Sequence, residues 1–82
     1  MEVTEAHRKV LRILYAWGLE HFDKYMMRDE LIARLGNSKN LNKIVVELKR
    51  DELVEVVPPD GRWRAIRIAP KGVRALQSMD VV

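Results

Sequence analysis

The chain has 82 residues, a length that fits one domain spanning residues 1–82, and its formal net charge is +3. Hydrophobic residues make up 48% of the chain and charged residues 33%, which favours a folded globular protein over a disordered one. There is no cysteine, no signal peptide and no apolar run near about 18 residues. This excludes disulfides and thiolate metal sites and favours a cytoplasmic protein without a membrane span.

The first predicted element is a helix that ends near Trp17 or Leu19. Thr4 can cap its N-terminus, because a hydroxyl accepts hydrogen bonds from the free amides of a first turn. Gly18 is expected to end this helix, and a loop from Glu20 to Lys24 to follow it. The inward face has helical spacing and consists of Ala6, Val10, Ile13, Leu14 and Trp17.

Three further apolar residues of this helix recur four apart, beside the inward face: Leu11, Tyr15 and Leu19. They form either a surface for homodimerisation or a contact with the C-terminal helix of the same chain.

A second helix is predicted from Arg28 to Leu35, after a candidate short strand at Tyr25 and Met26. Acidic residues in its first turn suit the helix dipole. Gly36 is expected to end it in the left-handed conformation. The inward residues are Leu31, Ile32 and Leu35.

A third helix is predicted within residues 38–51, with Ser38 as its cap. Its buried stripe is Leu41, Ile44, Val45 and Leu48. Its outward face carries three cations and a valine, flanked by two asparagines: Lys39, Lys43, Val46, Arg50, Asn40 and Asn42.

A β-hairpin is predicted next, because the hydrophobic pattern changes to alternation after Leu53. Its strands are Val54–Val57 and Trp63–Ala69, joined by a Pro58–Gly61 turn. Alternation places Arg64, Ile66 and Ile68 on one face and Trp63, Ala65 and Arg67 on the other. Pro70 opens a last helix that extends to Ser78.

The positive charge is concentrated in the third helix and the hairpin. Residues 38–74 hold nine cations and five anions, whereas residues 1–37 hold six of each. This distribution favours a polyanionic partner.

The order of elements is that of a winged helix-turn-helix, an α+β and mainly helical fold. It has three helices, a two-stranded β wing and a short C-terminal helix. From about Ala6 to Leu76 the chain resembles the DNA-binding lobe of MarR-type transcription regulators. The resemblance is carried by the segments LIARLGNS, VVELKRDELVEV and DGRWRAIRIAPKG.

Four departures from that family's pattern stand out. The segment after Gly36 is one residue shorter, Asp51 and Glu52 replace a glycine, and Ala69 replaces a capping threonine. The long terminal helices that dimerise the family are missing.

The fold implies a role for each outward residue of the third helix, since a major groove about 12 Å wide admits one helix. Asn40 and Asn42 are expected to pair with adenine and Lys43 with guanine. Lys39 and Arg50 are expected on phosphates. Val46 either touches a thymine methyl or packs against the wing or a partner subunit. Ser38 is also expected among the DNA-binding residues.

In the wing, the resemblance implies that Arg62 enters the minor groove and that Asp60, before the Gly61 turn, orients it. Arg64 and Arg67 make phosphate contacts or surface salt bridges. Trp63 is either an exposed contact residue or packs against a neighbouring element.

Other functional classes have little support. The two histidines, His7 and His21, lie far apart without a zinc-binding pattern, and no phosphate loop or catalytic triad is present. We therefore expect no enzyme, metal or cofactor. No small ligand is expected to be required, because the family's ligand pocket lies near the missing dimerisation helices. The leading interpretation is a sequence-specific, double-stranded DNA-binding regulator that acts as a homodimer. The alternatives are a winged helix that binds another protein or a binder of RNA or single-stranded DNA.

Overall fold

The computed structural model describes residues 3–21 and 24–80. The elements in chain order are α1 (Glu5–Glu20), β1 (Met26–Met27), α2 (Arg28–Leu35), α3 (Leu41–Arg50), β2 (Val54–Val57), β3 (Ala65–Ile68) and α4 (Pro70–Asp80). Strands β1, β3 and β2 lie side by side in that order and form an antiparallel sheet. The predicted α+β architecture is confirmed.

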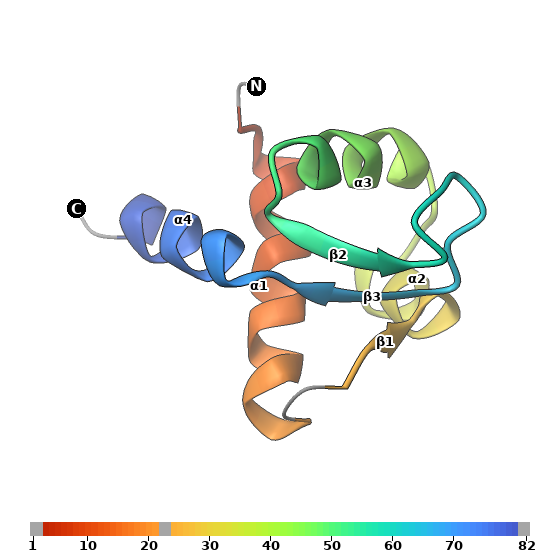
Figure 1. Cartoon of the computed structure of the whole chain (residues 1–82), viewed down its shortest axis with the longest axis horizontal. Helices are drawn as coiled ribbons and strands as arrows, with labels where there is room; N and C mark the ends of the chain where they lie inside the picture. Colours follow the sequence, from red (N-terminus) through yellow and green to blue (C-terminus); the bar gives the residue numbers. More distant parts are fainter. Residues whose placement is uncertain (1–2, 22–23, 81–82) are drawn as a thin grey trace.

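Helix α3 and the loop between β2 and β3 share one side of the molecule (Figure 1). Helix α1 crosses the sheet, α3 lies along β2, and α4 extends from the end of β3. The loop between β2 and β3 projects on the same side as α3. We call residues 58–64 the wing loop. No helix in the described ranges is long and apolar enough to cross a membrane.

The core lies where α1, α2, α3 and the sheet meet. Its least exposed large side chains come from every one of these elements, which explains how so short a chain encloses a core. They are Trp63, Leu11, Leu14, Met26, Leu31, Leu41, Leu48, Ile66, Val10 and Val45.

Helix α1 begins as predicted. The Thr4 hydroxyl accepts a hydrogen bond from the His7 amide, and the His7 ring accepts one from the Thr4 amide at 3.1 Å. This reciprocal cap satisfies two amides that the helix leaves free.

The predicted end of α1 at Gly18 is wrong. A glycine within a helix costs only about 1 kcal/mol, and the helix continues past it through Leu19. The helix ends at Glu20, where the His21 amide donates to the Trp17 carbonyl at 2.9 Å and the two rings stack. Of the expected 20–24 loop, residues 22–23 lie outside the described residues.

The buried face of α1 is rotated from the predicted one. The buried residues are His7, Val10, Leu11 and Leu14, whereas Ala6 is exposed. Leu11 is fully buried within its own chain. It therefore cannot belong to a dimer surface, and the alternative of a contact within the chain holds for this residue.

Helix α2 matches its prediction, and the short strand is shifted by one residue to β1. Met26 pairs with Ile66 of β3. Gly36 ends α2 with φ 90°, the left-handed conformation expected of it.

Helix α3 begins at Leu41, and the prediction that Ser38 caps it is wrong. Asn40 occupies the N-cap with φ 61° and makes no side-chain cap hydrogen bond. A left-handed residue there interrupts a helix, and asparagine tolerates this conformation. The Asn37 side chain accepts from the Lys39 amide at 3.0 Å. Ser38, Lys39 and Asn40 thus form an exposed turn before α3.

The end of α3 explains the departure at Asp51 and Glu52. Glu52 has φ 63°, and the Glu52 and Leu53 amides donate to the carbonyls of Lys49 and Leu48, each at 2.9 Å. This is the Schellman pattern, in which glycine is the usual residue with positive φ. Glu52 fills that position instead, with its backbone in the left-handed region that an L side chain disfavours.

The second hairpin strand is shorter than predicted, because Trp63 and Arg64 precede β3. The predicted alternation fails there: Trp63 and Ile66 are both buried, although Arg64 is exposed. The hairpin register pairs Val56 with Ile66 and Val57 with Ala65.

Helix α4 begins at Pro70 as predicted and continues to Asp80, beyond the predicted Ser78. The Leu53 carbonyl accepts from the Ala69 amide at 3.0 Å. Gly72 lies so close to this carbonyl that a Cβ would overlap it and would come within 2.8 Å of the Ile68 side chain. The glycine of the PKG segment is therefore required by packing.

Candidate nucleic-acid interface

The outer face of α3 presents four exposed side chains, those of Asn42, Lys43, Val46 and Arg50. Together with Glu47 they line one shallow hollow of about 410 Å³ on the helix. Val46 is 44% exposed, and it also lines a hollow that includes Asp60, Gly61 and Trp63 of the wing loop. The structure thus brings these predicted residues onto one face, while Ser38, Lys39 and Asn40 lie in the exposed turn before it.

Glu47 puts a carboxylate between the cations of this face. Because His7 Nδ1 accepts the Thr4 amide, the ring carries its proton on Nε2, which donates to Glu47 Oε1 at 3.2 Å. The Glu47 side chain is only partly exposed, and His7 is 4% exposed. This contact ties the start of α1 to the middle of α3 and draws the carboxylate toward α1.

The wing loop is held by contacts at its base and tip. Asp60 Oδ1 accepts from the Arg62 amide at 2.7 Å, and Lys49 Nζ donates to the Pro59 carbonyl at 2.6 Å. Asp60 therefore orders the backbone of Arg62, and both Arg62 and Arg64 are exposed.

Trp63 is buried, which decides between the two alternatives for this residue. It is 1% exposed at the base of the wing loop. The Arg28 guanidinium lies 4.7 Å from the centre of its ring, and Arg28 Nη1 donates to the Trp63 carbonyl at 3.2 Å. Arg28 Nη2 also donates to Asn42 Oδ1 at 2.8 Å.

Sequence reasoning missed Arg28. Its contact with Trp63 spans 35 positions and its contact with Asn42 spans 14. No local pattern connects these residues; only the burial of Trp63 and the packing of α2 beside the hairpin bring them together.

Arg67 forms a salt bridge within the sheet. Its guanidinium donates to Glu55 on the neighbouring strand and lies 4.7 Å from the centre of the Tyr25 ring. The salt-bridge alternative is therefore the one observed for Arg67.

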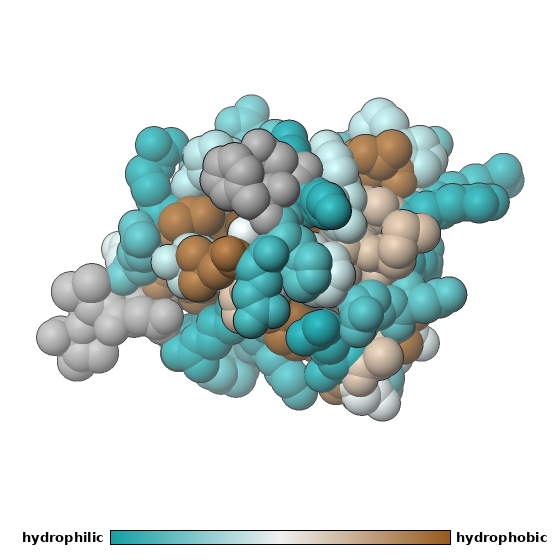
Figure 2. Space-filling view, turned by 90° about the horizontal axis from the view of Figure 1, so that it is seen from below, coloured by the Kyte–Doolittle hydropathy of each residue, from teal (hydrophilic) through white to brown (hydrophobic). Residues whose placement is uncertain are grey.

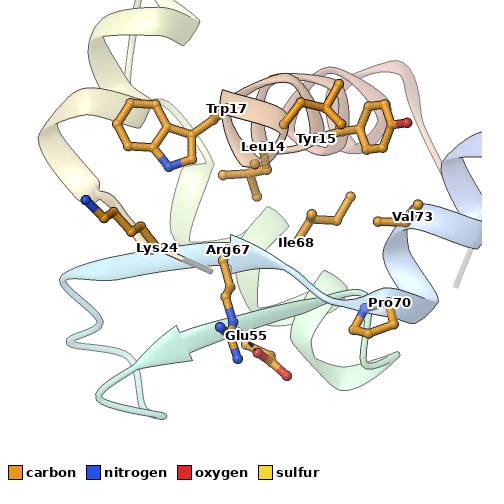
Figure 3. A pocket seen from close by; sticks show the side chains of 11 residues that line it. Leu14, Tyr15, Trp17, Lys24, Glu55, Arg67, Ile68, Pro70 and Val73 are labelled. Carbon is orange, nitrogen blue, oxygen red and sulfur yellow. Dashed lines mark hydrogen bonds and ion pairs between the residues drawn. The ribbon is translucent and has the colours of Figure 1, made fainter. Parts of the chain in front are cut away.

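A hollow of about 460 Å³ lies between α1, the sheet and α4, away from α3 (Figure 3). Leu14, Tyr15 and Trp17 line it from α1, and Ile68 and Val73 from the opposite side. Leu19 stands at this hollow and is 70% exposed. Figure 2 views the molecule from the side away from α3, and hydrophobic surface is visible there among hydrophilic residues.

Both histidines make contacts within the chain. His7 bridges Thr4 and Glu47, and His21 stacks on Trp17. Within residues 3–21 and 24–80, no group of three or more acidic, histidine or cysteine side chains is placed to hold a metal ion.

Comparisons with known proteins address the fold. No family model and no curated protein matches the sequence. Among solved structures, the chain is similar to MepR, a MarR-family winged-helix regulator, in the crystal structure of a mutant from a multidrug resistant S. aureus clinical isolate. The TM-score is 0.66 at 22% sequence identity, and the match covers 94% of this chain. The chain spans 57% of the length of that protein. The predicted winged-helix fold is confirmed.

Proposed function

We propose that this protein is a transcription regulator that binds double-stranded DNA sequence-specifically in the cytoplasm. Helix α3 and the turn before it enter the major groove, and the wing loop lies at the minor groove. The observation that carries the proposal is the outer face of α3. It is exposed and carries Lys43 and Arg50 beside the amide of Asn42.

The roles of these residues follow from their placement. Lys43 and Asn42 lie in the first turn of α3, the part of a recognition helix that meets base edges. Arg50 lies at the end of the helix and Lys39 in the turn before it, where phosphate contacts are expected. Arg64 is an exposed candidate for a further phosphate contact.

The wing loop supplies a second contact. Arg62 is exposed at the tip, and the Asp60 side chain orders its backbone. A cation in this position is attracted to the negative potential of a narrow minor groove. The similarity to a winged-helix regulator supports this arrangement.

The test is fluorescence anisotropy of a labelled random-sequence duplex, titrated with the protein over a salt series. We expect affinity to fall with salt, with a log–log slope of about −0.9 for each phosphate contacted. Arg62→Ala should weaken binding by about 1–2 kcal/mol. Unchanged affinity in this variant would remove the wing from the mechanism.

Arg74→Ala is the matched control for lost charge. Arg74 is an exposed cation on α4, on the far side of the molecule from the wing loop (Figure 1). It should leave both affinity and slope unchanged. If the unaltered protein does not bind duplex DNA even at low salt, the proposal fails.

We also propose that the protein acts as a homodimer through the hollow beside α1. Leu11 no longer belongs to this surface, whereas Tyr15 and Leu19 line the hollow. Leu19 leaves a large apolar side chain in water there, which marks a contact surface. Leu19→Glu should give monomers in sedimentation, and an unchanged sedimentation coefficient would exclude this surface.

The alternative function, a winged helix that docks another protein, is favoured by one observation. Val46 on α3 and Val57 at the end of β2 are both about half exposed. The DNA titration separates the two functions, since a docking surface gives no salt-dependent duplex binding.

A further inference from the structure

We propose that Arg28 is a positioning residue that fixes the amide of Asn42, so that Asn42 turns its oxygen toward Arg28 and its NH₂ group toward the DNA. The base pair facing Asn42 is then selected for an acceptor, guanine first, and not for adenine. This inference rests on the proposed DNA-binding function and changes the expected reading of one residue.

Arg28 is held in place from three directions. Its own amide donates to the Arg64 carbonyl at 2.8 Å, and its Nη1 donates to the Trp63 carbonyl at 3.2 Å. Its guanidinium also stacks over the indole of Trp63. Because Trp63 is buried in the core, the guanidinium lies on a fixed support.

A second guanidinium nitrogen, Nη2, determines the orientation of Asn42. Nη2 lies 2.8 Å from the Asn42 side chain. A guanidinium is only a donor, so the atom that faces it must be the amide oxygen and not the amide nitrogen. The usual ambiguity between the two atoms of an asparagine amide is therefore removed by chemistry. The NH₂ group is left for the exposed side of α3.

This orientation conflicts with the adenine reading expected from sequence. Bidentate recognition of adenine requires the amide oxygen to accept from N6 while the nitrogen donates to N7. With the oxygen turned to Arg28, the outward group is a donor. Guanine offers two major-groove acceptors, N7 and O6, whereas cytosine offers the donor N4.

The test is site selection from a random duplex library, followed by sequencing of the bound fraction. The unaltered protein should prefer guanine over adenine at one base pair by roughly three- to tenfold, the range of one net hydrogen bond. Asn42→Ala should abolish the preference at that pair. Arg28→Ala should shift the same pair toward adenine or remove its preference.

Arg34→Ala is the control, because Arg34 lies on the same helix and pairs with Glu30 and the Trp17 ring instead. It should leave the preference intact. The inference is overturned if the pair that depends on Asn42 is adenine in the unaltered protein. It is also overturned if Arg28→Ala leaves that pair unchanged.

A second measurement does not depend on DNA. In ¹H–¹⁵N spectra of the free protein, the side-chain amide signals of Asn42 should shift in Arg28→Ala and stay in place in Arg34→Ala. Unshifted signals in Arg28→Ala would refute the positioning role even if DNA is bound. If the Asn42 signals shift as expected but the protein does not bind DNA, the positioning role stands, and the proposed function and its base preference are rejected.

Discussion

At the scale of single residues, His7 connects two parts of the molecule that sequence patterns treat as separate. Its ring accepts from Thr4 and donates to Glu47. A prediction from apolar spacing assigns polar residues to the surface. The predicted inward face of α1 therefore did not include His7. The pairing with Glu47 lies 40 positions away, so the sequence holds no local signal for it.

His7→Ala should lower the free energy of unfolding by about 1–3 kcal/mol, because it removes a buried ring that closes the α1 cap and bonds Glu47. Urea denaturation measures the change. The neighbouring Lys9→Ala, an exposed substitution, should stay within about 0.5 kcal/mol. Equal midpoints for the two variants would contradict the structural role of His7.

Glu52→Gly should stabilise the protein. A side chain in the left-handed region costs about 1–2 kcal/mol, and the greater freedom of glycine in the unfolded chain returns about 0.5–1 kcal/mol of that. We expect a net gain of about 0.5–1 kcal/mol in thermal denaturation. Asp51→Gly, at the preceding residue with negative φ, is the control and should not stabilise.

At the scale of elements, the hydrophobic period located α2 and both hairpin strands, but it could not place the start of α3. The conformation of Asn40 decides that boundary, and neither its left-handed backbone nor the Asn37 contact with Lys39 changes the apolar spacing. The hydrophobic period also could not decide which face of α1 is buried. This helix has two apolar stripes that are almost equivalent in sequence. Only packing against the other elements determines that Leu11 is buried and Ala6 is exposed.

Helix α4 gives a prediction about the PKG segment. Gly72→Ala should destabilise the fold by about 1–3 kcal/mol, because the new methyl group would press on the Leu53 carbonyl and the Ile68 side chain. Gly18→Ala is the matched control: nothing lies within 4 Å of a Cβ there. It should stabilise α1 by about 0.5–1 kcal/mol. Thermal melts of the two variants should move in opposite directions; a shift in the same direction would show that Gly72 is not a packing requirement.

At the scale of the whole molecule, the winged-helix fold could be predicted because the order of elements and the DGR and PKG segments each point to it. The candidate interface could be predicted only in part. Asn42, Lys43, Val46 and Arg50 were grouped by helical spacing, and the structure places them on one exposed face. The link between Arg28, Trp63 and Asn42 depends on three elements packing together, which no single segment encodes.

The whole fold also distinguishes two leucines that the sequence grouped together. Leu11→Glu should unfold the protein, because it buries a charge in the core, whereas Leu19→Glu should fold normally. Circular dichroism separates the two outcomes. A folded Leu11→Glu variant would show that the core of α1 is arranged differently.

The order of the strands, with β3 in the centre, leaves β1 and β2 at the two edges of the sheet. Open edges invite strands of other molecules to add on, which is a common route to amyloid-like aggregation. Here β1 has two residues and β2 has four, and β2 runs directly into Pro58 and Pro59. Proline has no amide to donate, so the β2 edge cannot be extended toward the wing loop. We therefore expect the two prolines of the wing loop also to oppose edge-to-edge pairing at the β2 side of the sheet.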